Sequence, residues 1–188
     1  MKLIKRIFYA IYYKLKGISP EELSVAANIK AGMKVGKNCW GLVNCTIDHA
    51  HCWLIEIGDN VVFAPQVYLL AHDTSTKKSI EYTRVGKIKI GNNCFIGARV
   101  LIMPGVHIGD NTIIGAGSIL VKSIPENVVA AGNPAKIICT IAEYETKIKS
   151  NFESSPKFGN EYTLSSSIAN SMKQEMIDKT ENSIGFVK

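Results

Sequence analysis

The sequence has little of what marks a nucleic-acid-binding or disulfide-rich chain. Charged residues make up only 20% of its 188 positions, the formal net charge is +6, and the aromatic residues do not alternate with basic clusters. Binding to nucleic acid is therefore not expected. The five cysteines are an odd number and include no CxxC pair, so they predict core packing in a reducing compartment. With 46% hydrophobic residues, the chain is expected to fold around a continuous core.

A six-residue repeat runs from Ile90 to Pro125. Its units read IGNNCF, IGARVL, IMPGVH, IGDNTI, IGAGSI and LVKSIP. The first position is always aliphatic, the second is Gly in four of six units, and the fifth is small or β-branched. Stacked helical hairpins need about 20 or more residues per unit, so this period excludes them. It predicts a mainly β fold, a parallel β-helix in which each unit forms one short strand and one corner.

The frame of this repeat is interrupted twice. Units also begin at Ile57, Phe63 and Leu69, so three units per coil predict another at position 75, yet the next begins at Ile90. The fifteen extra residues predict a loop over about 75–89, extruded from a corner of the coil. A smaller slip of four residues predicts an exposed bulge within 48–56. Long loops without a period of their own are often functional.

The sequence divides into three parts. Residues 1–28 are expected to form an amphipathic helix and a lead-in, residues 29–138 the β-helix, and residues 139–188 a polar tail with helices near 140–150 and 167–180 and a linker over 151–166. Basic residues interrupt the apolar run in 1–16 and no small-residue cleavage site follows, so neither a signal peptide nor a membrane span is expected. This helix could dock on the open end of the coil, or rest on an anionic membrane surface. A cytoplasmic protein, with peripheral contact at the inner membrane face, is the expectation.

The stretch IGDNTIIGAGSILVKSIPENVVAAGNPAKII resembles the coenzyme-A end of hexapeptide-repeat acyltransferases, in the maltose, galactoside and polysaccharide O-acetyltransferase branch. The resemblance covers about residues 29–138. It implies a left-handed β-helix, a homotrimer with active sites between adjacent subunits, and acetyl-CoA as cosubstrate, with no metal. It also implies a saccharide acceptor, in capsular, exopolysaccharide or other surface glycan biosynthesis.

Acetyl transfer to a hydroxyl needs a base, and a neutral imidazole suits that role near pH 7. Among four histidines, His72 in LLAHDT precedes the predicted loop, where related enzymes place their catalytic histidine, so we expect it to be the general base. Asp73 could hold acceptor hydroxyls or orient the ring, or cap the loop as a turn residue. By resemblance Asn44 is expected to contact the acceptor, since an amide both donates and accepts hydrogen bonds, or else to stack with other asparagines at a turn of the β-helix. Asp48, beside the small bulge, is a further candidate for that contact.

Coenzyme contacts follow from the resemblance alone. Relatives bond pantetheine through main-chain amides, and the matching positions are Ala98 in IGARV and Ala116 in IGAGS. The stretch beside the nucleotide end corresponds to Val121, Lys122 and Lys136, whose lysines would pair with phosphates. Relatives often carry another basic residue three positions after the NPAK lysine, where this chain has Cys139.

Three other interpretations remain open. The segment Asp48–Cys52 contains two histidines and a cysteine, which are zinc-type ligands, but the short spacing and lack of a second cluster favour exposed bulge residues. A metal-binding or non-catalytic β-helix trimer would need several histidines on facing edges, and a single His72 on the matching edge argues against it. His107, in the sixth position of IMPGVH, is expected at the surface. N-acetylation of an amino sugar is the second enzymatic alternative, although such enzymes usually add a nucleotide-binding domain that residues 1–28 cannot hold.

Overall fold

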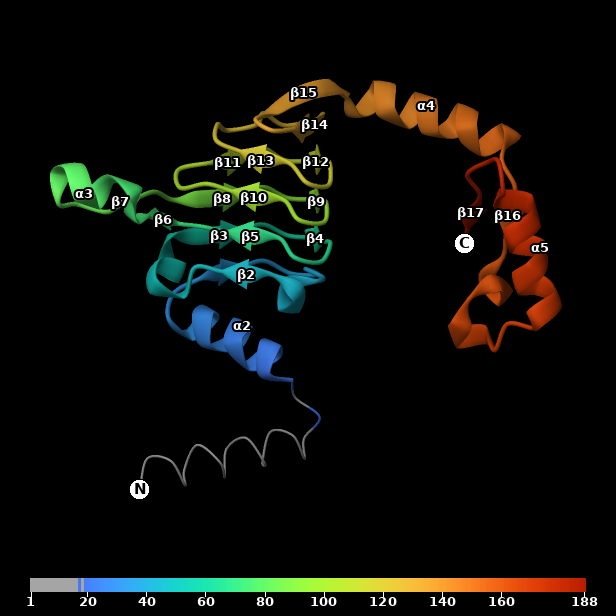
Figure 1. Cartoon of the computed structure of the whole chain (residues 1–188), viewed down its shortest axis with the longest axis horizontal. Coiled ribbons are helices and arrows are strands. Elements are labelled where there is room, and N and C mark those ends of the chain that lie inside the picture. Colours follow the sequence, from blue (N-terminus) through green and yellow to red (C-terminus); the bar gives the residue numbers. More distant parts are fainter. Residues whose placement is uncertain (1–16, 18) are drawn as a thin grey trace. The chain divides into compact units, whose positions relative to one another are not determined.

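The computed structural model describes Gly17 and residues 19–188, so the helix expected over 1–16 lies outside the described residues. The chain divides into two compact units, one ending at Ile141 and the other spanning Ala142–Lys188 (Figure 1). Within the described residues, no helix combines the length and apolar character needed to cross a bilayer.

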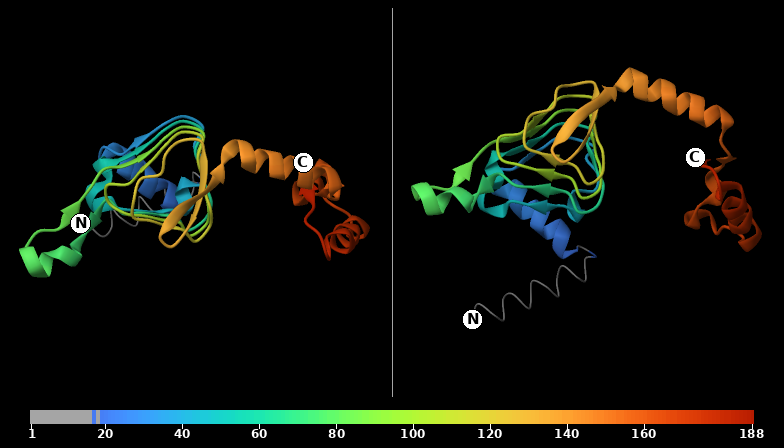
Figure 2. Two further views of the ribbon diagram at one scale, coloured as in Figure 1. Left: turned by 90° about the horizontal axis from the view of Figure 1, so that it is seen from above. Right: turned by 45° about the horizontal axis from the view of Figure 1, so that its top comes forward.

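Short strands of the first unit stack into three parallel sheets, one on each side of a triangular coil (Figure 2). Side A contains β1 (Lys34–Val35), β3 (Ile55–Ile57), β8 (Ile88–Ile90) and β11 (His107–Ile108). Side B contains β4 (Val62–Phe63), β9 (Phe95–Ile96), β12 (Ile113–Ile114) and β14 (Val128–Gly132), with β15 (Ala135–Thr140) antiparallel at its edge. Side C contains β2 (Thr46–Ile47), β5 (Tyr68–Leu69), β10 (Leu101–Ile102) and β13 (Ile119–Leu120). A parallel β-helix is confirmed.

The pairing register confirms both interruptions of the frame. Ile57 pairs with Ile90, so the coil closes over the fifteen-residue insertion without losing its alignment. Val35 pairs with Ile57, which accommodates the four-residue slip in the same way. Each extra segment therefore leaves the coil at a corner.

The inward face is built from the hydrophobic residues at the first position of the units. These side chains are at most 3% exposed on all three sides: Ile57, Ile90, Ile108, Phe63, Ile96, Ile114, Leu69, Ile102 and Leu120. Burying each one stabilises the coil by about 1.5–3 kcal/mol. Cysteines at the fifth position pack against this core, and burial raises the pKa of the Cys45 thiol to about 12. Cys45 is therefore a packing residue and not a nucleophile.

A ladder of asparagines runs along the corner between sides A and B. The side-chain amide of each asparagine donates to that of the next at 3.0–3.1 Å, through Asn38, Asn60, Asn93, Asn111 and Asn127. All five have positive φ values, which asparagine tolerates better than other non-glycine residues. The neighbouring glycines allow the coils to approach, since a Cβ at Gly58 would lie 2.8 Å from the carbonyl oxygen of Gly91.

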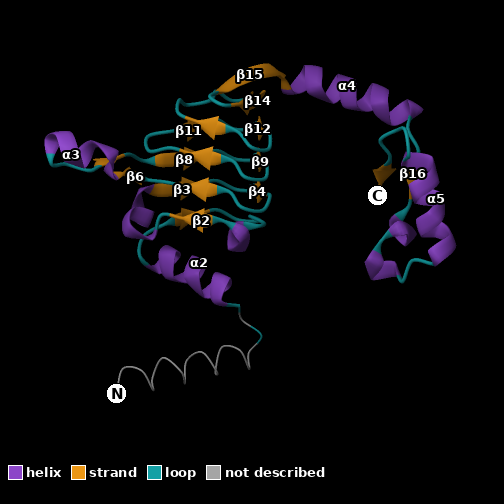
Figure 3. Ribbon diagram, viewed as in Figure 1, coloured by secondary structure: helices purple, strands orange, loops and turns teal. Residues whose placement is uncertain are grey.

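The larger insertion is an ordered hairpin that projects from the coil (Figure 3). It comprises β6 (His72–Asp73), η3 (Thr74–Thr76), α3 (Lys77–Ile80) and β7 (Arg84–Val85), and β6 pairs antiparallel with β7. The N–H of Gly86 donates to the carbonyl of Ala71 at 3.0 Å and closes its base. The predicted bounds of 75–89 were wrong at both ends, because the strand pairing starts at His72 and β8 has resumed at Ile88.

The smaller break is a 3-10 segment, η2 (His49–Leu54), capped by the side chain of Asp48. The expectation of exposed residues throughout this bulge was wrong, because the turn directs Cys52 into the core, where it is 0% exposed. The thiol of Cys52 donates to the carbonyl of Asn28 in α2 (Pro20–Lys30). Helix α2 contacts both η2 and η1 (Leu42–Asn44) at the start of the coil.

The second unit contains α4 (Ile141–Ser154), which begins at the unit boundary, and α5 (Asn170–Thr180), close to the two predicted helices. The predicted linker over 151–166 was wrong in part. It contains β16 (Lys157–Phe158), which pairs in parallel with β17 (Phe186–Val187), and the 3-10 turns η4 (Asn160–Tyr162) and η5 (Leu164–Ser166).

Candidate active site

His72 lies where the hairpin leaves the coil, at the corner between sides C and A. The N–H of Leu70 still donates to Ile102 in the next coil, and Ala71 is fully buried. His72 then opens β6 opposite Val85, with 33% of its side chain exposed. The coil thus fixes the backbone on one side of His72 while its imidazole remains accessible.

The carboxylate of Asp48 lies directly against this imidazole. Oδ2 of Asp48 is 2.5 Å from Nδ1 of His72, and the Asp48 side chain is only 1% exposed. The backbone brings the two together, because β2 pairs with β5 and the N–H of Asp48 donates to Leu69 at 2.9 Å. An ionised carboxylate only accepts hydrogen bonds, so Nδ1 of His72 is the donor. In the neutral ring this leaves the lone pair on Nε2, which is the arrangement of a general base with an orienting carboxylate.

A second imidazole, that of His51, stands beside the first. The His51 and His72 ring centroids are 4.9 Å apart and tilted by 48°. The backbone N–H of His51 donates to Oδ1 of Asp48 at 3.2 Å, while its ring Nδ1 lies 4.0 Å from the same oxygen. That Nδ1 is buried and has no hydrogen-bond partner among the described residues. Sequence reasoning missed this neighbour, although an Asp three residues before it is the signature of an N-cap.

Asp73 faces the hairpin. Its carboxylate accepts from the N–H of Ser75 at 2.9 Å and from Arg84 at 2.7 Å, across the β6–β7 pair. The Ser75 amide, followed by the Arg84 guanidinium, holds the pKa of Asp73 below its ordinary value. These contacts are those of the turn residue considered as an alternative to an acceptor contact.

The other predicted residues divide between two corners and the edge strand β15. Asn44, Ala98 and Ala116 lie at the corner between sides B and C, where Asn44 bonds Gln66 and Ala98 bonds Gly117 through the backbone. Val121 and Lys122 follow β13 at the corner between sides C and A, as His72 follows β5. Lys136 is exposed on β15, opposite Ala131. One protomer therefore holds the histidine and the two alanines at opposite edges of side C.

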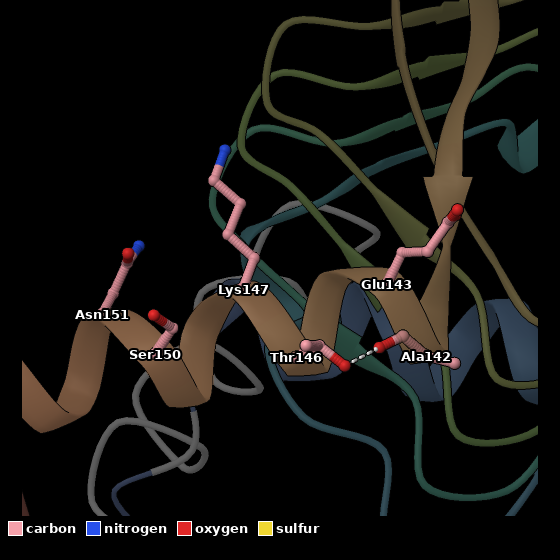
Figure 4. Close-up of a pocket in the computed structure, with 6 residues that line it drawn as sticks. All are labelled: Ala142, Glu143, Thr146, Lys147, Ser150 and Asn151. Atoms are coloured by element: carbon pink, nitrogen blue, oxygen red, sulfur yellow. Dashed lines mark hydrogen bonds between the residues drawn. The ribbon is translucent and has the colours of Figure 1, made fainter.

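A separate groove follows one face of α4 in the second unit (Figure 4). It is lined by Ala142, Glu143, Thr146, Lys147, Ser150 and Asn151. All six belong to the same helix, and Thr146 bonds back to the carbonyl of Ala142 at 2.9 Å. None of the predicted site residues lines it, so the candidate active site stays at the His72 corner.

Comparisons with known proteins agree with this fold. A family model described as bacterial transferase hexapeptide (six repeats) matches residues 87–122. Galactoside O-acetyltransferase from Escherichia coli (strain K12) is 41% identical over 141 residues, which cover 72% of this chain and 66% of that protein. The chain thus spans just under two thirds of that relative. Protein CapG from Staphylococcus aureus is 41% identical over 133 residues, covering 68% of this chain and 77% of that protein.

Among solved structures, a hexapeptide-repeat-containing acetyltransferase from Vibrio cholerae O1 biovar eltor, complexed with acetyl coenzyme A, superposes with a TM-score of 0.51. The match covers 58% of this chain and 60% of that chain, at 22% sequence identity. At that identity the likeness concerns the fold.

Proposed function

The chain belongs to the hexapeptide-repeat acetyltransferases, and we propose on that premise that it transfers an acetyl group from acetyl-CoA to a saccharide hydroxyl. The observation that carries the proposal is the pair formed by His72 and the buried carboxylate of Asp48, at the mouth of the extruded hairpin. The resemblance to galactoside O-acetyltransferase supports the acceptor class. CapG is a second relative, and the match covers most of the length of CapG.

In this mechanism Nε2 of His72 accepts the proton of the acceptor hydroxyl as its oxygen attacks the thioester carbonyl. Asp48 holds Nδ1–H in place and stabilises the imidazolium that forms. When the carbon–sulfur bond breaks, His72 returns the proton to the departing sulfur. Acetyl-CoA supplies an activated acetyl group, so this chain needs no nucleophile of its own. Asp48 thus acts through His72, and not on the acceptor as the sequence had suggested.

We propose that the working unit is a homotrimer with active sites between neighbouring subunits. One protomer separates the His72 corner from the Ala98 and Ala116 corner by the width of side C. A neighbouring subunit can bring its own alanine corner to His72. The main chain at Ala98 and Ala116 would then bond pantetheine, and Val121, Lys122 and Lys136 would lie along the nucleotide end.

The outward residues of the three sides support this assembly. Side B presents an apolar row in register, Val62, Phe95 and Ile113, and side C presents Tyr68, Leu101 and Ile119. Side A instead presents Lys34, Glu56, Lys89 and His107. Two apolar sides and one polar side suit a closed ring in which each subunit contacts two neighbours.

We propose a surface glycan as the acceptor, reached from the cytoplasmic side, with Asn44 of one subunit close to the acceptor held at His72 of another. Asn44 is exposed at the alanine corner, so it can reach a sugar only through that interface. By the same family resemblance, the coils are proposed to wind left-handedly.

The test is thioester consumption with a panel of galactosides, maltose, amino sugars and oligosaccharides. Loss of the thioester absorbance reports turnover, and lability of the product to mild base distinguishes an ester from an amide. His72→Ala should lower kcat by about 10²–10⁴-fold, the usual contribution of a positioned base. His107→Ala, an exposed histidine on side A, is the matched control. Full activity of His72→Ala would refute the assignment of the base.

A further inference from the structure

The imidazole of His51 is not used by the mechanism above. Its Nδ1 is buried without a hydrogen-bond partner among the described residues, which is unusual for a polar atom beside a carboxylate. It lies 4.0 Å from Oδ1 of Asp48, whose other oxygen bonds His72. Two imidazoles and one carboxylate thus converge on the same small volume.

The three side chains offer ligand atoms at distances that a metal ion can bridge. One ligand atom can be taken from each of Asp48, His51 and His72 so that all three lie within 4.8 Å of one another. Around tetrahedral zinc, N and O ligands sit about 2.0–2.2 Å from the metal, so neighbouring ligand atoms lie about 3.3–3.5 Å apart. The His72–Asp48 contact of 2.5 Å would open and the His51–Asp48 distance of 4.0 Å would close. Side-chain rotations of this size need no change in the coil.

We propose that Asp48, His51 and His72 bind Zn²⁺, and that the bound ion inhibits the transferase reaction, an effect that rests on the proposed function. Two imidazoles and one carboxylate are typical zinc ligands, whereas Mg²⁺ and Ca²⁺ prefer oxygen alone. The His51 and His72 side chains are 30% and 33% exposed, which leaves an entry path and a fourth position for water. Cys52 takes no part, because it is fully buried and bonded to Asn28.

This site differs from the local zinc cluster that the sequence pattern within Asp48–Cys52 suggested. That cluster joined neighbours within Asp48–Cys52, and its short spacing argued against metal. The third ligand instead comes from His72, 24 residues further along and one coil away from Asp48. The parallel pairing of β2 with β5 creates the site, so no local spacing reveals it.

Inhibition follows from the tautomer of His72. With Asp48 as its partner, Nδ1 carries the proton and Nε2 keeps the lone pair that a base requires. A metal ion binds the lone pair of a deprotonated nitrogen, so zinc at Nδ1 moves the proton to Nε2. The same imidazole then presents a donor where the reaction needs an acceptor. Zinc also occupies the carboxylate that would stabilise the imidazolium.

Binding is tested on the full chain after removal of metals with a chelator. Calorimetry with zinc chloride should show one site per chain, and Co²⁺ should give the visible absorption of a four-coordinate site without a cobalt–thiolate charge-transfer band. His51→Gln should weaken Zn²⁺ binding at least tenfold, whereas His107→Gln, which removes an exposed histidine elsewhere, should bind like the wild type. Equal affinity of wild type and His51→Gln, or a thiolate band, would overturn the site. His51→Ala is the second variant, with circular dichroism to establish that it folds.

The inhibitory effect is measured separately, with each variant normalised to its own rate without metal. Wild-type turnover should fall at least tenfold over the zinc concentrations that saturate the calorimetric site, and His51→Gln should need at least ten times more zinc. Full turnover at saturating zinc would overturn inhibition. If no acceptor supports turnover even without metal, the proposed function fails, and calorimetry still decides whether the zinc site exists.

Discussion

Replacing Asp48 by asparagine tests the catalytic arrangement more sharply than removing the histidine. The carboxylate accepts two hydrogen bonds, from Nδ1 of His72 at 2.5 Å and from the N–H of His51 at 3.2 Å. An amide of the same shape has one acceptor oxygen, so it cannot accept both. If its NH₂ faces His72, the ring must adopt the tautomer with Nε2–H and loses its basic lone pair. If its oxygen faces His72, the NH₂ opposes the His51 N–H, at a cost of about 1–3 kcal/mol for the unmade bond.

Both outcomes lower kcat. Loss of the charge-assisted hydrogen bond alone, about 1.5–3 kcal/mol, corresponds to roughly ten- to hundredfold. The wrong tautomer removes general-base catalysis, which contributes about 10²–10⁴-fold. We therefore expect Asp48→Asn to lower kcat by about 10²–10³-fold, with KM for acetyl-CoA within about threefold of the wild type. Asp59→Asn is the matched control, since among the described residues that carboxylate accepts only from the backbone N–H of Lys37, at a surface corner. A kcat within about threefold of wild type would refute the reasoning.

Three further predictions concern assembly, stability and pH. If the proposed trimer forms, Phe95→Glu should convert it to monomers, because the substitution buries a charge on side B, whereas His107→Glu on polar side A should not; light scattering of both variants decides this. Asn93→Ala should lower the free energy of unfolding by about 1–2 kcal/mol through its positive φ and lost ladder bonds, and Asn93→Gly by less; equal losses in denaturant titrations would contradict a backbone cost. The pKa of Asp73 is lower in the folded chain than in the unfolded chain, where it is 3.8. The ionised carboxylate therefore stabilises the folded hairpin fully above pH 3.8, and this contribution is lost as pH falls through the pKa of the folded chain. Limited proteolysis with an acid-active protease should then show faster cleavage of the hairpin in acid. In the Asp73→Asn variant, the rate of hairpin cleavage should not depend on pH.

The repeat makes much of the fold predictable. A six-residue period dictates which residues face inward and which strands pair, so the register of Ile57 with Ile90 follows from counting. Counting the six-residue units also locates both interruptions, and it shows that His72 lies beside the longer one. Position in a stacked coil is a local property, and each coil contacts only its neighbours.

The rest depends on contacts that no period encodes. The meeting of Asp48 with His72 needs the four-residue slip to place the end of β2 beside the end of β5. The burial of Cys52 and the position of His51 are set by a non-repeating 3-10 turn. Helix α2 did carry a readable signal, the capping box formed by Ser19 and Glu22, which lies outside the repeat.

Because of the hydrogen bond between Gly86 and Ala71, the fold of the coil depends little on the length of the hairpin. Its two ends are clamped to each other and to the coil, so the conformational entropy of closing the segment between them changes little with its length. A hairpin of different size or sequence could be exchanged at these two residues while the coil keeps its alignment. The segment next to His72 can therefore vary without any change in the packing of the core that positions this histidine.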